Sequence, residues 1–182
     1  FLIKEVNSCS SNGIYKISNK EELFDTLNSL SINKVSDFVL FQKLLNIKRD
    51  LRVILVGSEI ISYYWRINLS PDWRPTSTSK GNIVDFDNFP YKWKSWIIDQ
   101  FNLFNIRTGA FDIAWNNDDL DTTPYILEIS PFYQPNPRPE LSQNIQNYGD
   151  WKKSISFRDS YQAAFIKHVH SIQEKLVNVI LH

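Results

Sequence analysis

The chain has 182 residues, a length that suits one domain or two small lobes with a substantial buried core. Basic and acidic residues number 20 each, so the charge balance argues against nucleic acid or an anionic membrane as partner. The single cysteine, Cys9, excludes an internal disulfide and a cysteine-only metal cluster. No signal-like start and no apolar run of about 20 residues is present, which predicts a cytoplasmic protein without a membrane span.

The beginning of the sequence is unusual. There is no methionine, and the chain opens directly in the apolar stretch Phe-Leu-Ile-Lys. A natural start would carry an initiator methionine. We therefore expect this sequence to be the later part of a longer polypeptide, with a further domain upstream.

Residues 1–5 and 14–17 are predicted strands, joined by a small polar loop at 6–13. Small residues allow backbone N–H groups to approach a phosphate closely, although an ordinary hairpin turn would use the same residues. Lys4 interrupts the first apolar strand. It is either an edge lysine that hinders aggregation or a cation that binds phosphate near the loop.

A helix is predicted next, from a capping box at Ser18 and Glu21 to about residue 30. Leu23, Leu27 and Leu30 give it an apolar face. Residues 37–45 are predicted to form a mostly buried strand, and 46–50 a polar break.

Residues 51–56 and 59–67 predict a hairpin whose turn begins with Gly57. In the second strand Ser62, Tyr64 and Arg66 share one face, because side chains alternate along a strand. Arg52 likewise interrupts an apolar run. A surface ion pair and a contact to a ligand are both compatible with either arginine.

The following segments are a long irregular loop at 68–88 and a predicted helix at 90–104. The aromatic stripe of that helix predicts core packing; alternatively, Trp73, Trp93 and Trp96 would contact a sugar or peptide. A closing helix is predicted at 160–181. His168 and His170 lie two positions apart in it and cannot face one site.

Residues 109–138 hold two apolar runs around a turn-rich segment at 116–123, which predicts two antiparallel strands. Asp112 lies in the first run and Glu128 in the second, and strict alternation places Ile126, Glu128 and Ser130 on one face. A carboxylate is costly to bury without compensation. A divalent metal would compensate both, although a position at a strand end or pairing with an arginine would also do so.

Hairpins interleaved with helices indicate an α+β chain with mostly antiparallel sheets. From residue 1 to about 138, the ordered set of these residues resembles the ATP-grasp superfamily. The set comprises Lys4, the small loop, the strand at 38–45, the segment 50–57, Arg66, Asp112 and Glu128. The resemblance implies two α+β lobes that clamp ATP, a small lid-bearing lobe at 1–45 and a metal-binding lobe with the closing helix at 46–182. It also implies an upstream substrate-binding domain.

The resemblance further implies roles for individual residues. Lys4 would bind the nucleotide phosphates, and Arg66, with Lys4, would act in catalysis; Arg52 would lie near them. Asp50 matches an acidic contact to the ribose. The lid would include Cys9, Ser10, Ser11 and Gly13, and the adenine-reading hinge Gln42, Lys43, Leu44 and Leu45. The ligands of Mg²⁺ or Mn²⁺ would be Asp112, Glu128 and Ser130, and substrate contacts Asn136 and Arg138.

The function implied is an ATP-dependent ligase that joins a carboxylate to an amine, or a similar nucleophile, through an acyl-phosphate. The substrates would be small molecules or peptides, and self-association as a homodimer is left open. Ser130 stands where the family usually has asparagine, which keeps a catalytically weak or regulatory nucleotide-binding module as an alternative. An aromatic-rich sugar- or peptide-binding protein without a nucleotide is the third alternative.

Overall fold

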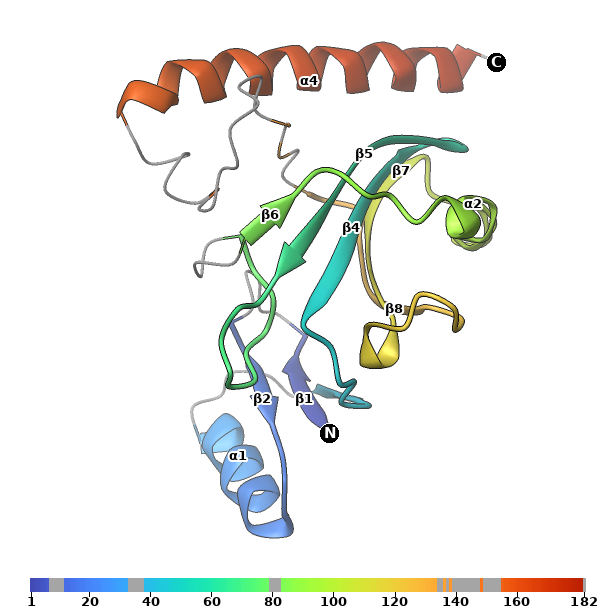
Figure 1. The fold of residues 1–182 in the computed structure, drawn as a ribbon. Helices are drawn as coiled ribbons and strands as arrows, with labels where there is room; N and C mark the ends of the chain where they lie inside the picture. The colour runs from blue at the N-terminus through green and yellow to red at the C-terminus, as the bar shows by residue number, and fades with distance from the viewer. Residues whose placement is uncertain are drawn as a thin grey trace.

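The computed structural model describes residues 1–6, 12–32, 38–78, 83–133, 136, 138, 148 and 155–181. These residues form two β-sheets with helices beside them (Figure 1), and every strand pair is antiparallel. The predicted α+β class is therefore confirmed. Among the described residues, no helix combines the length and the apolar character needed to cross a membrane.

The first sheet has three strands, β1 (Leu2–Glu5), β2 (Ile14–Lys16) and β3 (Val39–Gln42), in the order β2-β1-β3. Helix α1 (Lys20–Ile32) follows β2. Its predicted apolar face is confirmed: Leu30 is buried with Ile3 and Ile17, and Leu23 and Leu27 pack against the same cluster. This small core holds the helix on the sheet.

The start of α1 differs by one residue from the predicted capping box. Asn19 Oδ1 accepts the Glu22 backbone N–H at 2.9 Å, and Glu22 Oε2 accepts the Ser18 backbone N–H at 2.7 Å. Asn19 is thus the capping residue and Glu22 its acidic partner, in place of Ser18 and Glu21. Asparagine caps a helix as well as serine does, so the sequence offered two adjacent solutions.

Strand β3 is shorter and more exposed than predicted. Residues 37–45 were expected to be mostly buried, but β3 has four residues, and Leu40 and Phe41 are 57% and 60% exposed. The reason is topological, because β3 is an edge strand of a small sheet. The polar break expected at 46–50 is also shorter, since β4 already begins at Arg49.

The second sheet has five strands in the order β6-β5-β4-β7-β8. Its strands are β4 (Arg49–Val56), β5 (Glu59–Ile67), β6 (Ile83–Asp85), β7 (Thr108–Ala114) and β8 (Tyr125–Ser130). Strand β6 lies in the segment 68–88 that was expected to be irregular throughout. It was missed because three residues carry too little alternation to predict a strand.

One face of this sheet carries the main hydrophobic core. The 3₁₀ turn η1 (Tyr91–Trp93) leads into helix α2 (Lys94–Leu103), whose Ile97 and Phe101 are fully buried against the sheet. Leu51, Val53 and Leu55 alternate toward the same core. The residues between them therefore point to the opposite face, on which the polar residues gather.

Helix α4 (Ile155–Leu181) begins earlier than predicted and runs along the upper end of the molecule in Figure 1. Its last turns lie beside the β4–β5 turn, where Lys175 pairs with Glu59 and Arg107 donates to the Val179 carbonyl at 3.3 Å. The small sheet and α1 lie at the opposite end of the large sheet.

The pairing of β7 with β8 contains a register shift that corrects the predicted strand faces. Asp112 pairs with Glu128 but Ile113 pairs with Ile126, so Leu127 has no partner in the register. Ile126 consequently packs against the hydrophobic core, as Ile129 does. The expectation that Ile126 and Glu128 share a face is wrong, because one extra residue reverses the alternation.

Candidate functional site

A row of four polar side chains crosses the large sheet on the face away from α2. Arg52 pairs in register with Tyr64 on β5 and with Asp112 on β7, and Asp112 pairs with Glu128 on β8. Residues directly opposite in antiparallel strands share a face and lie about 4.5–5.5 Å apart at Cβ. Both predicted metal-binding carboxylates are thus brought side by side.

Two arginines hold Asp112, Arg52 from the adjacent strand β4 and Arg66 from β5, the strand beyond it. Arg52 donates from Nε to Oδ1 at 2.6 Å and from its terminal nitrogen to Oδ2 at 2.8 Å. Arg66 also reaches Asp112 Oδ2, at 2.8 Å. Asp112 therefore receives hydrogen bonds from both guanidinium groups, and pairing with arginine is the compensation seen for its burial.

Asp50 forms the other end of this network. Arg66 Nε donates to Asp50 Oδ1 at 2.9 Å, and the terminal nitrogen of Arg66 donates to Oδ2. Thr76, from the loop after β5, donates its hydroxyl to the same Oδ2 at 2.7 Å. Carboxylates and guanidinium groups alternate from Asp50 through Arg66 and Asp112 to Arg52. We call these four residues and Thr76 the arginine cluster.

The arginine cluster is largely removed from solvent, with Asp50 1%, Asp112 4% and Arg66 7% exposed. Burial raises the pKa of Asp50, although Arg66 and Thr76 act in the opposite direction. Burial also acts to raise the pKa of Asp112, but there the two arginines outweigh it and the pKa is lowered. Asp112 is therefore a carboxylate at neutral pH, as a metal ligand must be.

Lys4 approaches this site from the small sheet. Its Nζ donates to the Leu127 carbonyl at 3.5 Å, and Gln42 donates to the same oxygen at 3.4 Å. Leu127 is the residue that the register shift leaves unpaired. Burial lowers the pKa of Lys4, while Glu128, Asp112 and Asp50 act to raise it. The lysine is thus within electrostatic reach of the carboxylates on the large sheet.

The predicted lid and hinge residues are only partly within the described ranges. Cys9, Ser10 and Ser11 lie outside them. Gly13 has a positive φ of 63°, and its carbonyl accepts the Glu5 N–H at 2.9 Å. In the hinge segment, which also includes Gln42 and Leu44, Lys43 lies over the Tyr125 ring and Leu45 is buried. The structure places this segment directly beside β8.

The donor chemistry at Asp112 and Glu128 fits a hard divalent cation. Mg²⁺ is commonly bound through one or two carboxylates, with water and substrate phosphates as its other ligands. Glu128 is exposed and accepts the Ser130 hydroxyl at 2.9 Å, so Ser130 lies next to the Glu128 carboxylate. Within the described ranges no group of three or more acidic, histidine or cysteine side chains forms a metal site. The fit therefore rests on two carboxylates and a hydroxyl.

The structure separates the two predicted substrate contacts. Asn136 is 3% exposed and donates at 2.8 Å to the hydroxyl of Tyr64, the member of the polar row that pairs with Arg52. Arg138 is exposed and pairs with Asp87 at 2.8 Å, near the end of β6. Asn136 thus supports the polar row, whereas Arg138 lies at the sheet edge.

Sequence reasoning missed Tyr64 and Thr76 as parts of the site. Tyr64 could have been found, because it precedes Arg66 by two residues on the same predicted face. Thr76 lies in an irregular loop, and no periodicity in its neighbourhood points toward Asp50. Only the folded loop brings its hydroxyl there.

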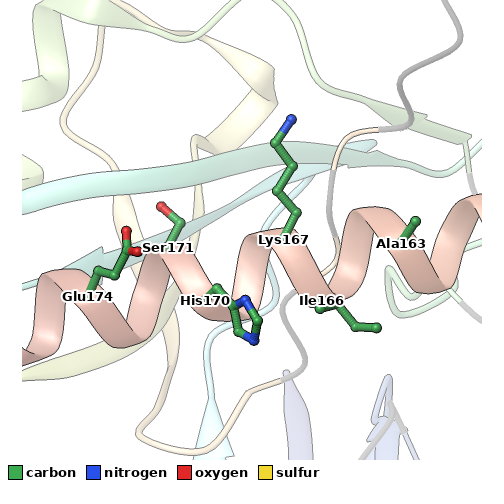
Figure 2. Close-up of a pocket in the computed structure, with 6 residues that line it drawn as sticks. All are labelled: Ala163, Ile166, Lys167, His170, Ser171 and Glu174. Atoms are coloured by element: carbon green, nitrogen blue, oxygen red, sulfur yellow. The ribbon is translucent and has the colours of Figure 1, made fainter.

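Two further features lie apart from the arginine cluster. A hollow on α4 is lined by residues of one helix face, among them Lys167, His170 and Glu174 (Figure 2). None of the polar row lines it. Trp93 and Trp96 pack against the main core, and Trp93 Nε1 donates to the Leu120 carbonyl at 2.8 Å. Their packing supports the core role and not the sugar-binding one.

No protein-family model matches the chain, and no curated protein matches it in sequence. Solved structures do match its fold. The ATP-grasp ligase PsnB, complexed with a phosphomimetic variant of a minimal precursor, Mg and ADP, has a TM-score of 0.51 and 17% identity. The match covers 92% of this chain and 46% of that one. The chain has the ATP-grasp fold.

A second match is D-alanine–D-alanine ligase from Bacillus anthracis, with a TM-score of 0.58 and 14% identity over 98% of this chain and 54% of that one. The same ligase complexed with ATP has a TM-score of 0.56 and 13% identity, over 98% and 52% of the two chains. This chain therefore spans about half the length of these ligases.

Proposed function

We propose that this chain is the nucleotide- and metal-binding part of an ATP-dependent ligase that joins a carboxylate to an amine or a similar nucleophile. The main support is the meeting of Lys4, from the small sheet, with the carboxylates and the arginine cluster of the large sheet. A cation from the small sheet thus lies within electrostatic reach of the carboxylates and arginines of the large sheet. A nucleotide triphosphate with its metal has the complementary charges.

In this proposal Lys4 and Arg66 bind the phosphate groups, and Arg52 adds positive charge beside them. Asp112 and Glu128 would hold Mg²⁺ or Mn²⁺, with Ser130 next to them. The metal, when bound, would neutralise charge on the phosphates. Because the arginines are already held by carboxylates, little reorganisation would be needed when phosphate arrives.

The reaction that we propose is phosphorylation of a carboxylate by ATP, followed by attack of the amine on the acyl-phosphate. The segment with Cys9, Ser10, Ser11 and Gly13 would cover the phosphates and keep water from that intermediate. Gln42, Lys43, Leu44 and Leu45 would form the adenine site. PsnB is complexed with a variant of a minimal precursor, and we propose a peptide carboxylate among the substrates to test.

A catalytically weak nucleotide-binding module is the second candidate, and one observation favours it. The Ser130 hydroxyl is donated to Glu128 at 2.9 Å, and a serine reaches less far than the asparagine that the family usually has there. Such a module would bind ATP and metal but consume ATP slowly. Replacement by asparagine would then raise its activity.

The test is release of ADP by the intact protein with Mg²⁺, ATP and a panel of carboxylates, peptides and amines. We expect Asp112→Asn and Glu128→Gln each to lower turnover at least ~100-fold, because each removes a charged metal ligand. Circular dichroism and thermal unfolding check that the fold is intact.

Glu59→Gln is the matched control, since Glu59 is an exposed carboxylate on β5 at the far end of the sheet. It should leave turnover unchanged. Wild-type-like turnover in both Asp112→Asn and Glu128→Gln would overturn the proposal. If the wild-type protein binds ATP without consuming it and Ser130→Asn gives turnover, the protein is the catalytically weak nucleotide-binding module.

A further inference from the structure

Arg66 is held between two carboxylates that compete for it. Its terminal nitrogen donates to Asp50 Oδ2 and also approaches Asp112 Oδ2, at 2.8 Å. Its Nε donates only toward Asp50, at 2.9 Å. The direction of the guanidinium plane therefore depends on where the Asp50 carboxylate stands.

The Asp50 carboxylate is itself fixed from the loop after β5. Thr76 donates its hydroxyl to Oδ2 at 2.7 Å, across 26 positions of sequence. Thr76 is partly buried in that loop, and Asp50 is fully enclosed at 1% exposure. One hydroxyl thus connects the long loop to the network that contains Arg66.

We propose that Thr76 is a positioning residue that, through Asp50, sets the orientation of Arg66. The catalytic part of this inference rests on the proposed function, but the orientation of Arg66 does not. It also gives Asp50 a role within the chain, because its two oxygens accept from Arg66 and Thr76 and so hold the arginine.

The physical reason lies in the competition for the terminal nitrogen. When Thr76 is removed, Oδ2 of Asp50 loses a fixed donor, and the carboxylate is free to rotate. The hydrogen bonds from Arg66 to Asp50 then weaken, and Asp112 becomes the stronger partner of the Arg66 guanidinium group. Arg66 would turn toward Asp112, away from its position between the carboxylates and onto the oxygens that a metal would need.

The test follows the Nε–H resonance of Arg66 in protein labelled with ¹⁵N-arginine. The resonance is assigned by its loss in Arg66→Lys. In Thr76→Val, which removes the hydroxyl but keeps the shape, we expect the resonance to shift and to exchange with water about fivefold faster, as loss of one ordinary hydrogen bond implies. Thr76→Ser should restore it.

Thr78→Val is the matched control, a threonine of the same loop outside the Asp50 contact. It should leave unchanged both the Arg66 resonance and the resonance of Arg52, whose hydrogen bonds go to Asp112. An Arg66 resonance that is identical in wild type and Thr76→Val would overturn the inference. So would equal changes in Thr76→Val and Thr78→Val.

The kinetic arm separates this inference from the proposed function. In an active protein, Thr76→Val should lower kcat more than it raises the KM for ATP, and Thr76→Ser should recover the kcat. The melting temperatures of the variants should not follow the order of their kcat values. If wild type consumes no ATP but the Arg66 resonance changes as expected, the positioning role holds and the proposed function fails. If turnover is present but Arg66 does not respond, the reverse is true.

Discussion

Asp50 and Asp112 have the same side chain and nearly the same burial, yet their pKa values move in opposite directions. The difference lies in the number of guanidinium groups that each carboxylate contacts. Asp112 is bonded to Arg52 and Arg66, and Asp50 to Arg66 and an uncharged hydroxyl. Two nearby cations overcome the cost of removing a carboxylate from water, and one does not.

The pKa of Lys4 predicts how the affinity for ATP depends on pH. Burial lowers its pKa below the ordinary value of 10.5, so the lysine loses its proton, and with it the charge that would bind phosphate, at a lower pH than a free lysine. We therefore expect the affinity for ATP to be full below the lowered pKa and to fall as pH rises through it. Calorimetric titration with Mg-ATP between about pH 7 and 10 measures this.

Two variants check the assignment to Lys4. Lys4→Arg should keep its affinity over the same pH range, because an arginine side chain stays charged throughout. Lys16→Arg, at an exposed position of β2, should retain the alkaline fall. An unchanged pH dependence in Lys4→Arg would contradict the role of Lys4.

At the scale of elements, the β4–β5 turn and α4 depend on one another at Gly57. This glycine has a φ of 55°, a conformation that costs an L-residue roughly 1–2 kcal/mol. A Cβ added there would also lie 3.0 Å from Val179 Cγ2 on α4. The turn therefore requires glycine both for its backbone and for the approach of the helix.

We expect Gly57→Ala to lower the free energy of unfolding by at least about 1 kcal/mol in urea denaturation, from backbone strain alone. The contact with α4 should add to that. In a Val179→Ala background the cost of Gly57→Ala should be smaller, because the clash is removed while the strain stays. An equal cost in both backgrounds would mean that α4 does not press on the turn.

At the scale of the whole molecule, the described residues connect the two sheets near the proposed site through long polar contacts to one carbonyl and through the segment between β3 and β4. Lys4 and Gln42 reach the Leu127 carbonyl over 3.5 and 3.4 Å, and Asn46 bonds to Asn116 and Asn117. The two bonds to the Leu127 carbonyl are at the long limit for a hydrogen bond and are therefore weak. A ligand that contacts both sheets would therefore strengthen a connection that the chain alone makes loosely.

Hydrogen exchange measures this effect. With Mg-ATP, we expect slower amide exchange in β1 and β3 and also in β7 and β8, since bound nucleotide stabilises both sheets against opening. The Glu128→Gln variant should lose this protection under the same conditions. Protection confined to one sheet would contradict a nucleotide held between the two.

The sequence by itself indicated most of the element types, the antiparallel hairpins and most of the residues that gather around Asp112. It did so because alternation and helical spacing are local properties: the leucines of α1, the Gly57 turn and the pair Asp112 and Glu128 can be read without knowing their neighbours. The resemblance to ATP-grasp proteins came from the order of such residues along the chain.

Only the tertiary structure decided how those residues are partnered. The register shift at Leu127 points Ile126 toward the hydrophobic core and leaves the Leu127 carbonyl to accept from Lys4 and Gln42. The loop after β5 brought the Thr76 hydroxyl to Asp50. Both depend on contacts between segments far apart in sequence, whose energies no local pattern contains. Apart from Tyr64 and Thr76, the residues of the candidate site were therefore predictable, and the way each is held was not.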